Sequence, residues 1–273
     1  LPMIVQKSDG GYNYETTEMA AHYHRVKKEK ATRIIIVTDA GQSLHFAMIF
    51  KAAEKAQYFD PEQVQLDHVP FGVVLGPDGK KFKTRSGETE KLIDLLMGAI
   101  QRAKQILKTR LPLLSEEELE KSAKILGIDA VKYADLCCHR IKDYVFSYDR
   151  MLKFEGNTAA FLLYAYVRIQ GIKRKVGKEA VKGPIVLSHP SEVAMAFHLC
   201  LFPETLQMMS QDLLPNRLCD YLYVLAEKFH AFFRDCRVEG SSEENSRLLL
   251  SEAAAQVLKK GLSILGLQTL ERM

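Results

Sequence analysis

Residues 33–38 read Arg-Ile-Ile-Ile-Val-Thr, a run of mainly β-branched apolar side chains. A continuous run of this kind is typical of strands that are buried on both faces of a parallel sheet. The chain then turns at residues 39–42, Asp-Ala-Gly-Gln, and Ser43 is placed to cap a helix that continues to about Gln57. A strand followed by a helix is the unit from which parallel sheets are built.

The residues before this strand predict a second unit of the same kind. Residues 1–7 favour a short strand, residues 8–11 a glycine turn, and Thr16 or Thr17 an N-cap for a helix to about Lys28. The side chains expected on its buried side are Met19, Ala20 and Tyr23. The order βαβαβ indicates an α/β nucleotide-binding sheet. The sequence contains neither GxGxxG nor GxxxxGK[ST], so a dinucleotide fingerprint and a P-loop are excluded.

Residues 68–87, HVPFGVVLGPDGKKFKTRSG, predict a β-hairpin after the second strand and helix. Val73 and Leu75 alternate with smaller neighbours, residues 76–79 have turn composition, and residues 81–85 resume an extended pattern. The returning arm is basic, with Lys80, Lys81, Lys83 and Arg85. A mobile basic finger can close over a polyphosphate and neutralise its charge during a reaction. The alternative is a solvated basic hairpin at the surface.

From Glu88 onward the periodicity is helical. Residues 115–118, Ser-Glu-Glu-Glu, form a capping box at the start of one helix, and Gly127 is expected to end it. Further helices are predicted at 130–141, 157–174, 191–209, 213–236 and 244–265, with an irregular loop at 177–190. We therefore expect two domains, an α/β domain at residues 1–150 and an all-helical domain at 151–273.

Length and composition fit a globular protein with one large or two ordinary domains, since the chain has 273 residues. A net charge of +4 permits a nucleic-acid partner without requiring one. No apolar run reaches the about 20 residues that a membrane helix needs. Five cysteines without CxxC spacing argue against a zinc site or a disulfide framework and favour a reducing cytoplasm. The chain begins with Leu1 rather than Met, and we expect it to be a piece of a longer protein.

Two groups of polar residues in the α/β part are candidates for a site. Tyr14 and Glu18 are four residues apart, so a carboxylate and a hydroxyl can face one ligand and accept a guanidinium. The alternative is that Glu18 only complements the helix dipole and Tyr14 belongs to the core. Gln42 and His45 follow the carboxyl end of a strand, where they can meet a ligand amine and a phosphate or ribose.

A basic run in the helical part is the third candidate site. It comprises Arg168, Lys173, Arg174, Lys175, Lys178 and Lys182, opposed within the run only by Glu179. Such a run is either the solvated end of a helix or a set of contacts to an RNA phosphate backbone.

Several of these stretches resemble the arginyl-tRNA synthetases, which are class I aminoacyl-tRNA synthetases. Residues 7–21, KSDGGYNYETTEMAA, resemble the family block SDGGY.Y.TTD, and residues 38–46, TDAGQSLHF, resemble D-x-x-Q-x-x-H-F. Residues 82–85, FKTR, fall where the class signature KMSKS has its last four residues, with Thr84 in place of the second lysine.

Carried over residue by residue, the resemblance implies a set of roles. Arginine binding falls on Tyr14, Glu18 and Gln42, and ATP binding on His45, His68, Val73, Val74 and Phe82. The catalytic loop residues would be Lys81, Lys83, Thr84 and Arg85. Two departures are visible. Glu18 stands where the family usually has Asp, and no motif like HIGH is present, so the front half of the active site is expected to be missing.

The stretches AVKYADL, FEGNTA, LCDYLY and the terminal ERM resemble landmarks of the family's helical anticodon-binding domain. The resemblance implies tRNA contacts by Arg168, Lys173, Arg174, Phe233 and Met273. The expected architecture is an α/β Rossmann-like parallel-sheet half-domain followed by an all-α helical-bundle anticodon-binding domain of DALR type.

The family's partners follow from the same resemblance. They are ATP with Mg²⁺, L-arginine and tRNA(Arg), with no metal ligands in the protein itself, no membrane and a monomeric state. Two alternatives stay open: a tRNA-binding paralogue that has lost catalysis, and a generic ATP-using ligase.

Overall fold

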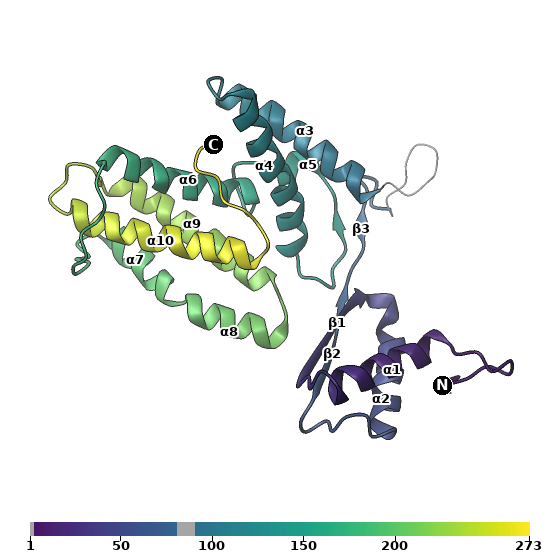
Figure 1. Cartoon of the computed structure of the whole chain (residues 1–273). Helices are drawn as coiled ribbons and strands as arrows, with labels where there is room; N and C mark the ends of the chain where they lie inside the picture. The colour runs from purple at the N-terminus through teal and green to yellow at the C-terminus, as the bar shows by residue number, and fades with distance from the viewer. Residues whose placement is uncertain (1–2, 81–90) are drawn as a thin grey trace. The chain divides into compact units, whose positions relative to one another are not determined.

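The structure is a computed structural model that describes residues 3–80 and 91–273 (Figure 1). The chain forms two compact units by its internal contacts. The sheet unit contains Leu1–Val73 with Ile141–Asp143, and the helical unit contains Val74–Arg140 with Tyr144–Met273. An α/β part followed by a helical part was predicted, and this order is confirmed. The division of the chain into domains at residue 150 stays a prediction.

The sheet unit contains two parallel strands and the two helices that flank them. Its elements are α1 (Tyr14–Lys27), β1 (Arg33–Asp39), the short 3₁₀ helix η1 (Ala40–Gln42), α2 (Ser43–Lys55) and β2 (Gln65–Phe71). β1 and β2 pair in parallel, from Arg33 opposite Gln65 to Asp39 opposite Phe71. Met19 of α1 with Phe46 and Ile49 of α2 forms the buried core of this unit.

The prediction that β1 is buried on both faces is wrong for the described chain. Ile34 is 6% exposed, whereas Ile35 and Val37 on the opposite face are 45% and 61% exposed. Because successive side chains of a strand point to opposite faces, the packing covers mainly the side of Ile34 and Ile36. When both faces of a strand are apolar, the sequence does not reveal which face is covered by other residues of the same chain.

The N-terminal prediction was also wrong in its details. Residues 3–7 form no strand and have only an isolated bridge between Gln6 and Tyr12. Helix α1 starts at Tyr14, because the hydroxyls of Thr16 and Thr17 donate to the carbonyls of Val5 and Tyr14 instead of accepting helix N–H groups. Its buried residues are Met19, as expected, and His22, while Ala20 and Tyr23 are exposed.

The predicted turn at residues 76–79 is present in the helical unit. The Gly79 amide donates to the Gly76 carbonyl at 2.9 Å, and Gly79 has φ +72°, a conformation that favours glycine. Strand β3 (Val74–Leu75) before the turn pairs in parallel with β4 (Tyr144–Val145). The returning arm of the predicted hairpin, residues 81–85, lies outside the described residues.

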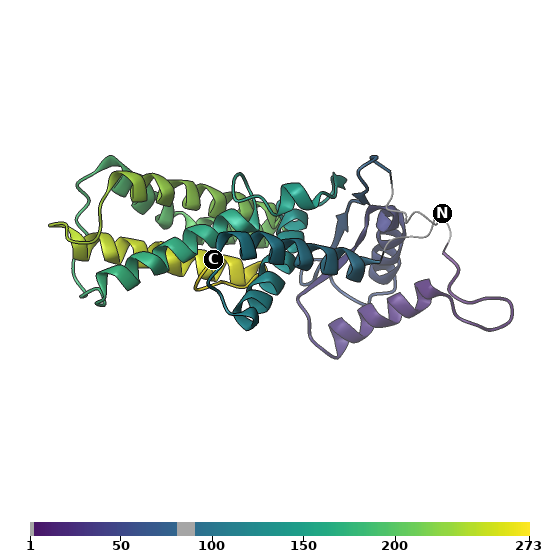
Figure 2. The same ribbon diagram turned by 90° about the horizontal axis from the view of Figure 1, so that it is seen from above.

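Helices make up most of the helical unit. They are α3 (Leu92–Arg110), α4 (Glu116–Leu136), α5 (Tyr148–Met151), α6 (Ala159–Val176), α7 (Pro190–Cys200), α8 (Phe202–Asp212), α9 (Asn216–Asp235) and α10 (Glu244–Ile264). α6, α9 and α10 pack against one another, and α4 contacts both α3 and α6 (Figures 1 and 2). In the described part of the chain, no helix combines the length and apolar character needed to cross a membrane.

In two places the division of the chain into helices differs from the prediction. The capping box at Ser115 and Glu118 is confirmed, but the helix predicted to end at Gly127 and the one predicted at 130–141 are a single helix that ends at Leu136. The predicted helix 191–209 is two helices, because Pro203 in the first turn of α8 cannot donate a backbone hydrogen bond to a continuing helix. Gly127 was singled out in the sequence but is not a helix end, and Pro203 was overlooked as a helix break.

Gly127 is required by the close packing of α4 on α3. A Cβ atom at this position would lie 2.7 Å from both the Cα and the amide nitrogen of Ile100, which are backbone atoms. We expect Gly127→Ala to lower the free energy of unfolding by about 1–3 kcal/mol, since overpacking outweighs the gain in helix propensity. Urea unfolding of the chain measures this.

The matched control is Gly171→Ala in α6. A Cβ atom there meets only the Arg174 side chain, at 3.9 Å. This change should leave stability unchanged or raise it by up to about 1 kcal/mol. Equal effects of the two substitutions would show that close packing does not explain Gly127.

Candidate functional site

The first candidate site is built on a stacked pair of rings in the sheet unit. Tyr14 is the first residue of α1, and His45 lies in the first turn of α2. Their rings stack with centroids 5.2 Å apart and planes at 16°. The helices pack on each other, and this places two residues 31 positions apart at the start of adjacent helices.

Glu18 lies one turn after Tyr14 in the same helix. The Tyr14 hydroxyl donates a hydrogen bond to the Glu18 carboxylate, and this bond, with burial and the carboxylate charge, raises the pKa of Tyr14. The expected pairing of a hydroxyl and a carboxylate is therefore present. A carboxylate with remaining acceptor positions can bind a guanidinium through two parallel N–H···O bonds.

Gln42 lies three residues before His45 in the chain. The carboxylate of Asp39 at the end of β1 accepts the Gly41 amide at 2.8 Å and shapes η1, which ends at Gln42. The Gln42 side chain is exposed. The site therefore lies after the carboxyl end of a parallel strand, which is the edge at which open α/β sheets bind ligands.

The two histidines of this region have different surroundings. His45 has a buried Nε2 atom that finds no hydrogen-bond partner among the described residues. His68 in β2 stacks on Phe46, with centroids 5.1 Å apart, and its Nε2 lies 2.8 Å from the Thr38 hydroxyl of β1. The sequence argument missed Thr38. Its place at the end of β1 was visible, but its pairing with His68 depends on the register of β1 and β2.

The remaining residues assigned to ATP and catalysis are Val73, Val74 and those of the predicted loop. Val73 belongs to the sheet unit, where its amide donates to the Asp143 carboxylate at 2.6 Å, and Val74 belongs to the helical unit. The positions Lys81, Phe82, Lys83, Thr84 and Arg85 lie outside the described residues. Their predicted roles stay predictions.

In the helical unit the structure brings Arg168 and Phe233 together. The Arg168 guanidinium lies 4.6 Å from the Phe233 ring centroid and 4.5 Å from that of Tyr164, with a hydrogen bond to the Tyr164 hydroxyl. Phe233 is 41% exposed. His230 fills the space beside Tyr164 (centroids 6.0 Å apart), and burial lowers its pKa to about 4, helped by the nearby Arg168 charge.

The other predicted RNA contacts form a second group at the end of α6. Lys173 pairs with Glu252 of α10 at 3.0 Å, and Arg174 donates to the Glu271 carbonyl at 3.1 Å. This tethers the C-terminal segment that carries Met273, which is partly buried against the helical core. Lys173 and Arg174 lie five and six residues after Arg168, so their side chains leave α6 on a different side from that of Arg168. The five predicted residues do not form one cluster.

Comparison with known families identifies the two parts of the chain. A family described as class I tRNA synthetases (R), catalytic domain, matches residues 1–148, and the DALR anticodon-binding domain matches residues 162–273. A catalytic part followed by an anticodon-binding part defines the class, a tRNA synthetase of class I. The chain belongs to the arginyl-tRNA synthetase family.

Individual relatives agree with this assignment. The chain is 64% identical to an arginine–tRNA ligase of Protochlamydia amoebophila and 53% identical to that of Chlamydia caviae. All of this chain aligns, and it spans about half the length of these relatives, 47% and 49%. The crystal structure of arginyl-tRNA synthetase from Plasmodium falciparum matches with a TM-score of 0.85 and 33% identity, over 100% of this chain and 47% of that one.

The pairing of Tyr14 with Glu18 has a measurable consequence above neutral pH. The hydrogen bond to the Glu18 carboxylate stabilises the protonated hydroxyl, so Tyr14 should lose its proton at a higher pH than an ordinary tyrosine. Glu18→Gln removes the charge and should lower that pKa toward its usual value. Labelled tyrosine ring carbons followed by NMR across pH 8–12 measure it, with the Tyr14 signal assigned by Tyr14→Phe.

Glu227→Gln is the matched control, because Tyr223 donates to the Glu227 carboxylate with the same four-residue spacing in α9. That change should shift the signal of Tyr223 and leave that of Tyr14 in place. An unchanged Tyr14 titration in Glu18→Gln would contradict the described pairing.

Proposed function

We propose that this chain contributes the arginine-binding edge and the anticodon-binding domain of an arginyl-tRNA synthetase, which joins L-arginine to the 3′ end of tRNA(Arg) with ATP. The observation that carries the proposal is the hydrogen bond between Tyr14 and Glu18, with the Tyr14 ring stacked on that of His45, which lies in the first turn of the helix that follows β1 and η1. A carboxylate, a hydroxyl and the Gln42 amide together suit a ligand with a guanidinium at one end and an amine at the other.

In the proposed first step, a carboxylate oxygen of arginine attacks the α-phosphorus of ATP. The bond from that phosphorus to the bridging oxygen of the β-phosphate breaks, so arginyl-adenylate and pyrophosphate form. Glu18 and Tyr14 would hold the guanidinium and Gln42 the amine, which orients the carboxylate for in-line attack. His45 and His68, with Val73, Val74 and Phe82, would line the ATP site.

The charge that moves onto pyrophosphate needs donors, and Lys81, Lys83 and Arg85 would provide them, with Thr84 beside them in the signature loop. Mg²⁺, when bound with ATP, would supply further positive charge for the same purpose. In the described residues no three His, Cys, Asp or Glu side chains converge on a metal position. We propose that the ion enters with the ATP phosphates, as Mg²⁺ commonly does.

In the second step the terminal ribose hydroxyl of tRNA takes the arginyl group from the adenylate and AMP leaves. Arg168 and Phe233 on one side of α6, and Lys173, Arg174 and Met273 on another, would hold the anticodon arm through phosphate contacts and base stacking. A carboxylate that faces the guanidinium would reject uncharged amino acids strongly, because it would be left unpaired. The site therefore discriminates without an editing reaction.

We further propose a monomer in the cytoplasm. All five cysteines are unpaired thiols, and a reducing compartment suits that state.

Arginine binding tests the proposal directly. Arginine should raise the melting temperature of the chain, and Gln42→Ala should abolish this shift because the amine loses its acceptor. Thermal unfolding with and without millimolar L-arginine measures the effect. Gln207→Ala, an exposed glutamine in α8, is the matched control and should retain the full shift.

Lysine and citrulline separate the possible outcomes. Stabilisation by arginine but not by uncharged citrulline supports a carboxylate at the guanidinium. Absence of any arginine effect would favour the alternative, a tRNA-binding paralogue without catalysis, and equal effects of all three ligands would favour a generic ligase.

The isolated chain should not catalyse pyrophosphate exchange with arginine, ATP and tRNA, because it contains no motif like the HIGH signature. Radiolabelled pyrophosphate incorporated into ATP measures this. Clear turnover by the chain alone would show that it already contains a complete adenylation centre.

A further inference from the structure

Two adjacent thiol groups lie at the C-terminal end of α4, outside every site described above. Cys137 follows Leu136, the last residue of α4, and Cys138 comes next. Both thiols are free and half-buried, and both residues line a cavity of about 420 Å³. None of the described residues assigned to arginine, ATP or tRNA lines this cavity. The pair is therefore available to a ligand that the synthetase reaction does not use.

The end of α4 fixes the two cysteines relative to each other. The Cys137 amide donates to the Tyr133 carbonyl at 2.8 Å, and the Cys138 amide donates to the Asp135 carbonyl at 3.3 Å. The Cys137 thiol donates to the Ala134 carbonyl at 3.4 Å. Burial raises the pKa of Cys137 to about 12, helped by a negative charge on Cys138 and by a hydrogen bond between the two side chains. The sulfur atoms therefore lie near enough to share one bound atom, and Cys137 keeps its proton at neutral pH.

The cavity beside the thiols has an apolar wall. Tyr133, Tyr144 and Met151 contribute to it, and Tyr133 and Met151 are buried. The thioether of Met151 is a polarisable sulfur group that packs well against rings. A cavity of about 150 Å³ is enough to bind benzene. The larger cavity at the end of α4 therefore has room for a group of that size next to the two sulfur atoms.

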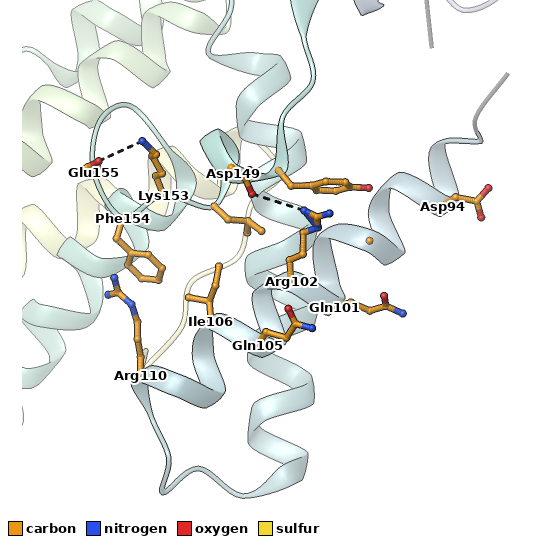
Figure 3. A pocket seen from close by; sticks show the side chains of 13 residues that line it. Asp94, Gln101, Arg102, Gln105, Ile106, Arg110, Asp149, Lys153, Phe154 and Glu155 are labelled. Carbon is orange, nitrogen blue, oxygen red and sulfur yellow. Dashed lines mark ion pairs between the residues drawn. The ribbon is translucent and has the colours of Figure 1, made fainter. Parts of the chain in front are cut away.

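The segment before α6 forms part of the cavity wall. It contributes Lys153 and Glu155, whose side chains form an ion pair at 3.7 Å (Figure 3). Glu155 is 81% exposed, so this pair contributes little to stability. The same two residues line a larger open cavity of about 1090 Å³ along α3, whose wall includes Arg110 and Phe154 (Figure 3). The exposed side chains of the ion pair can turn aside at low cost when a ligand enters.

The chemistry of the pair argues against most metal ions. Within residues 3–80 and 91–273, no three His, Cys, Asp or Glu side chains converge on one position, as a zinc site requires. A metal also needs thiolates, which the raised pKa of Cys137 disfavours. A trivalent arsenical with one carbon substituent, R–As(OH)₂, has different needs. It takes two protonated thiols: two As–S bonds replace two As–O bonds, two water molecules leave, and arsenic remains trivalent.

We propose that Cys137 and Cys138 are a two-thiol binding site for trivalent arsenicals with one carbon substituent, in which arsenic bridges both sulfur atoms and the substituent occupies the cavity. The inference goes beyond the proposed function and does not depend on it. Tyr133 lines the same cavity, and its hydroxyl lies 2.5 Å from the Asn157 side-chain oxygen before α6. A bound arsenical would therefore act directly on a contact that joins α4 to the segment before α6.

The probe is phenylarsine oxide, which in water gives the phenyl compound of this class. The intact chain is incubated with one equivalent, treated with excess glutathione and measured by mass spectrometry. We expect the wild-type chain to retain one phenylarsenic group, which a dithiol such as dimercaptopropanol removes. Cys137→Ser and Cys138→Ser should each weaken retention about 100-fold or more, because the second As–S bond forms within one molecule. With one thiol replaced, the remaining adduct is displaced by glutathione.

Cys200→Ser is the matched control. Cys200 is an exposed thiol in α7, outside the cavity. A single accessible thiol forms only an adduct that glutathione displaces, so this variant should retain the phenylarsenic group as the wild-type chain does. Far-UV circular dichroism and thermal melting of each variant verify the fold. Methylarsonous acid tests the cavity, because a methyl group buries less apolar surface than a phenyl ring and should be retained less tightly.

Release of the phenylarsenic group from the wild-type chain by glutathione would overturn the inference outright. Full retention by the Cys137 and Cys138 variants would show that other residues bind arsenic. Loss in Cys219→Ser together with retention in Cys138→Ser would assign the site to Cys137 and the buried Cys219 instead. Equal retention of the methyl and phenyl compounds would overturn the placement of the substituent in the cavity. The arginine-dependent melting shift is measured separately, so none of these results bears on the proposed function.

Discussion

The arrangement of the helical unit depends on one buried hydroxyl group. Tyr133 of α4 is fully buried, and its oxygen lies 2.5 Å from Asn157 Oδ1 and 3.0 Å from the Cys219 carbonyl of α9. The Asn157 amide donates in turn to Asp220 at 3.2 Å. A buried hydroxyl without acceptors costs about 1–3 kcal/mol, so α4, α9 and the segment before α6 are held in register. Burial also raises the pKa of Tyr133 far above that of a solvated tyrosine, so the hydroxyl stays a donor.

The contacts of Tyr133 also fix the segment before α6. Asn157 ends the segment that contains Lys153 and Phe154, and the Thr158 hydroxyl caps α6 while it donates to the Lys153 carbonyl at 2.6 Å. Phe154 is thereby held between Arg110 of α3 and Tyr164 of α6. The contacts of Phe154 with Arg110 and Tyr164 therefore depend on the buried polar contacts that fix this segment.

The charges of the helical unit differ in how available they are. Lys173 and Lys178 of the basic run pair with Glu252 and Glu244 of α10, at 3.0 and 2.7 Å. Arg168 is instead held by two rings, which orient its guanidinium without neutralising it. A count of basic residues treats these side chains as equivalent. Their neighbours show that an arginine stacked on aromatic rings is better prepared for a phosphate than a lysine already paired with a carboxylate.

By itself the sequence determined the features that depend on neighbouring residues. The β-branched run of β1, the capping box at Ser115 and the pairing of Tyr14 with Glu18 one helical turn later all follow from local geometry. Family motifs in the sequence also led to the synthetase assignment. Local rules failed where the partner was distant: Gly127 lies inside α4 and is a glycine because the backbone of α3 leaves no room for a Cβ atom.

Only the tertiary structure decided which residues meet across the chain. His45 stacks on Tyr14 from 31 positions away, Phe233 reaches Arg168 from another helix, and Arg110 lies over Phe154 at the wall of a cavity. None of these contacts has a periodic pattern, because each depends on the crossing and register of two separate elements. Spacing along the chain can predict the face of a helix on which a side chain lies, but the neighbour on that face is set by the packing of the whole unit.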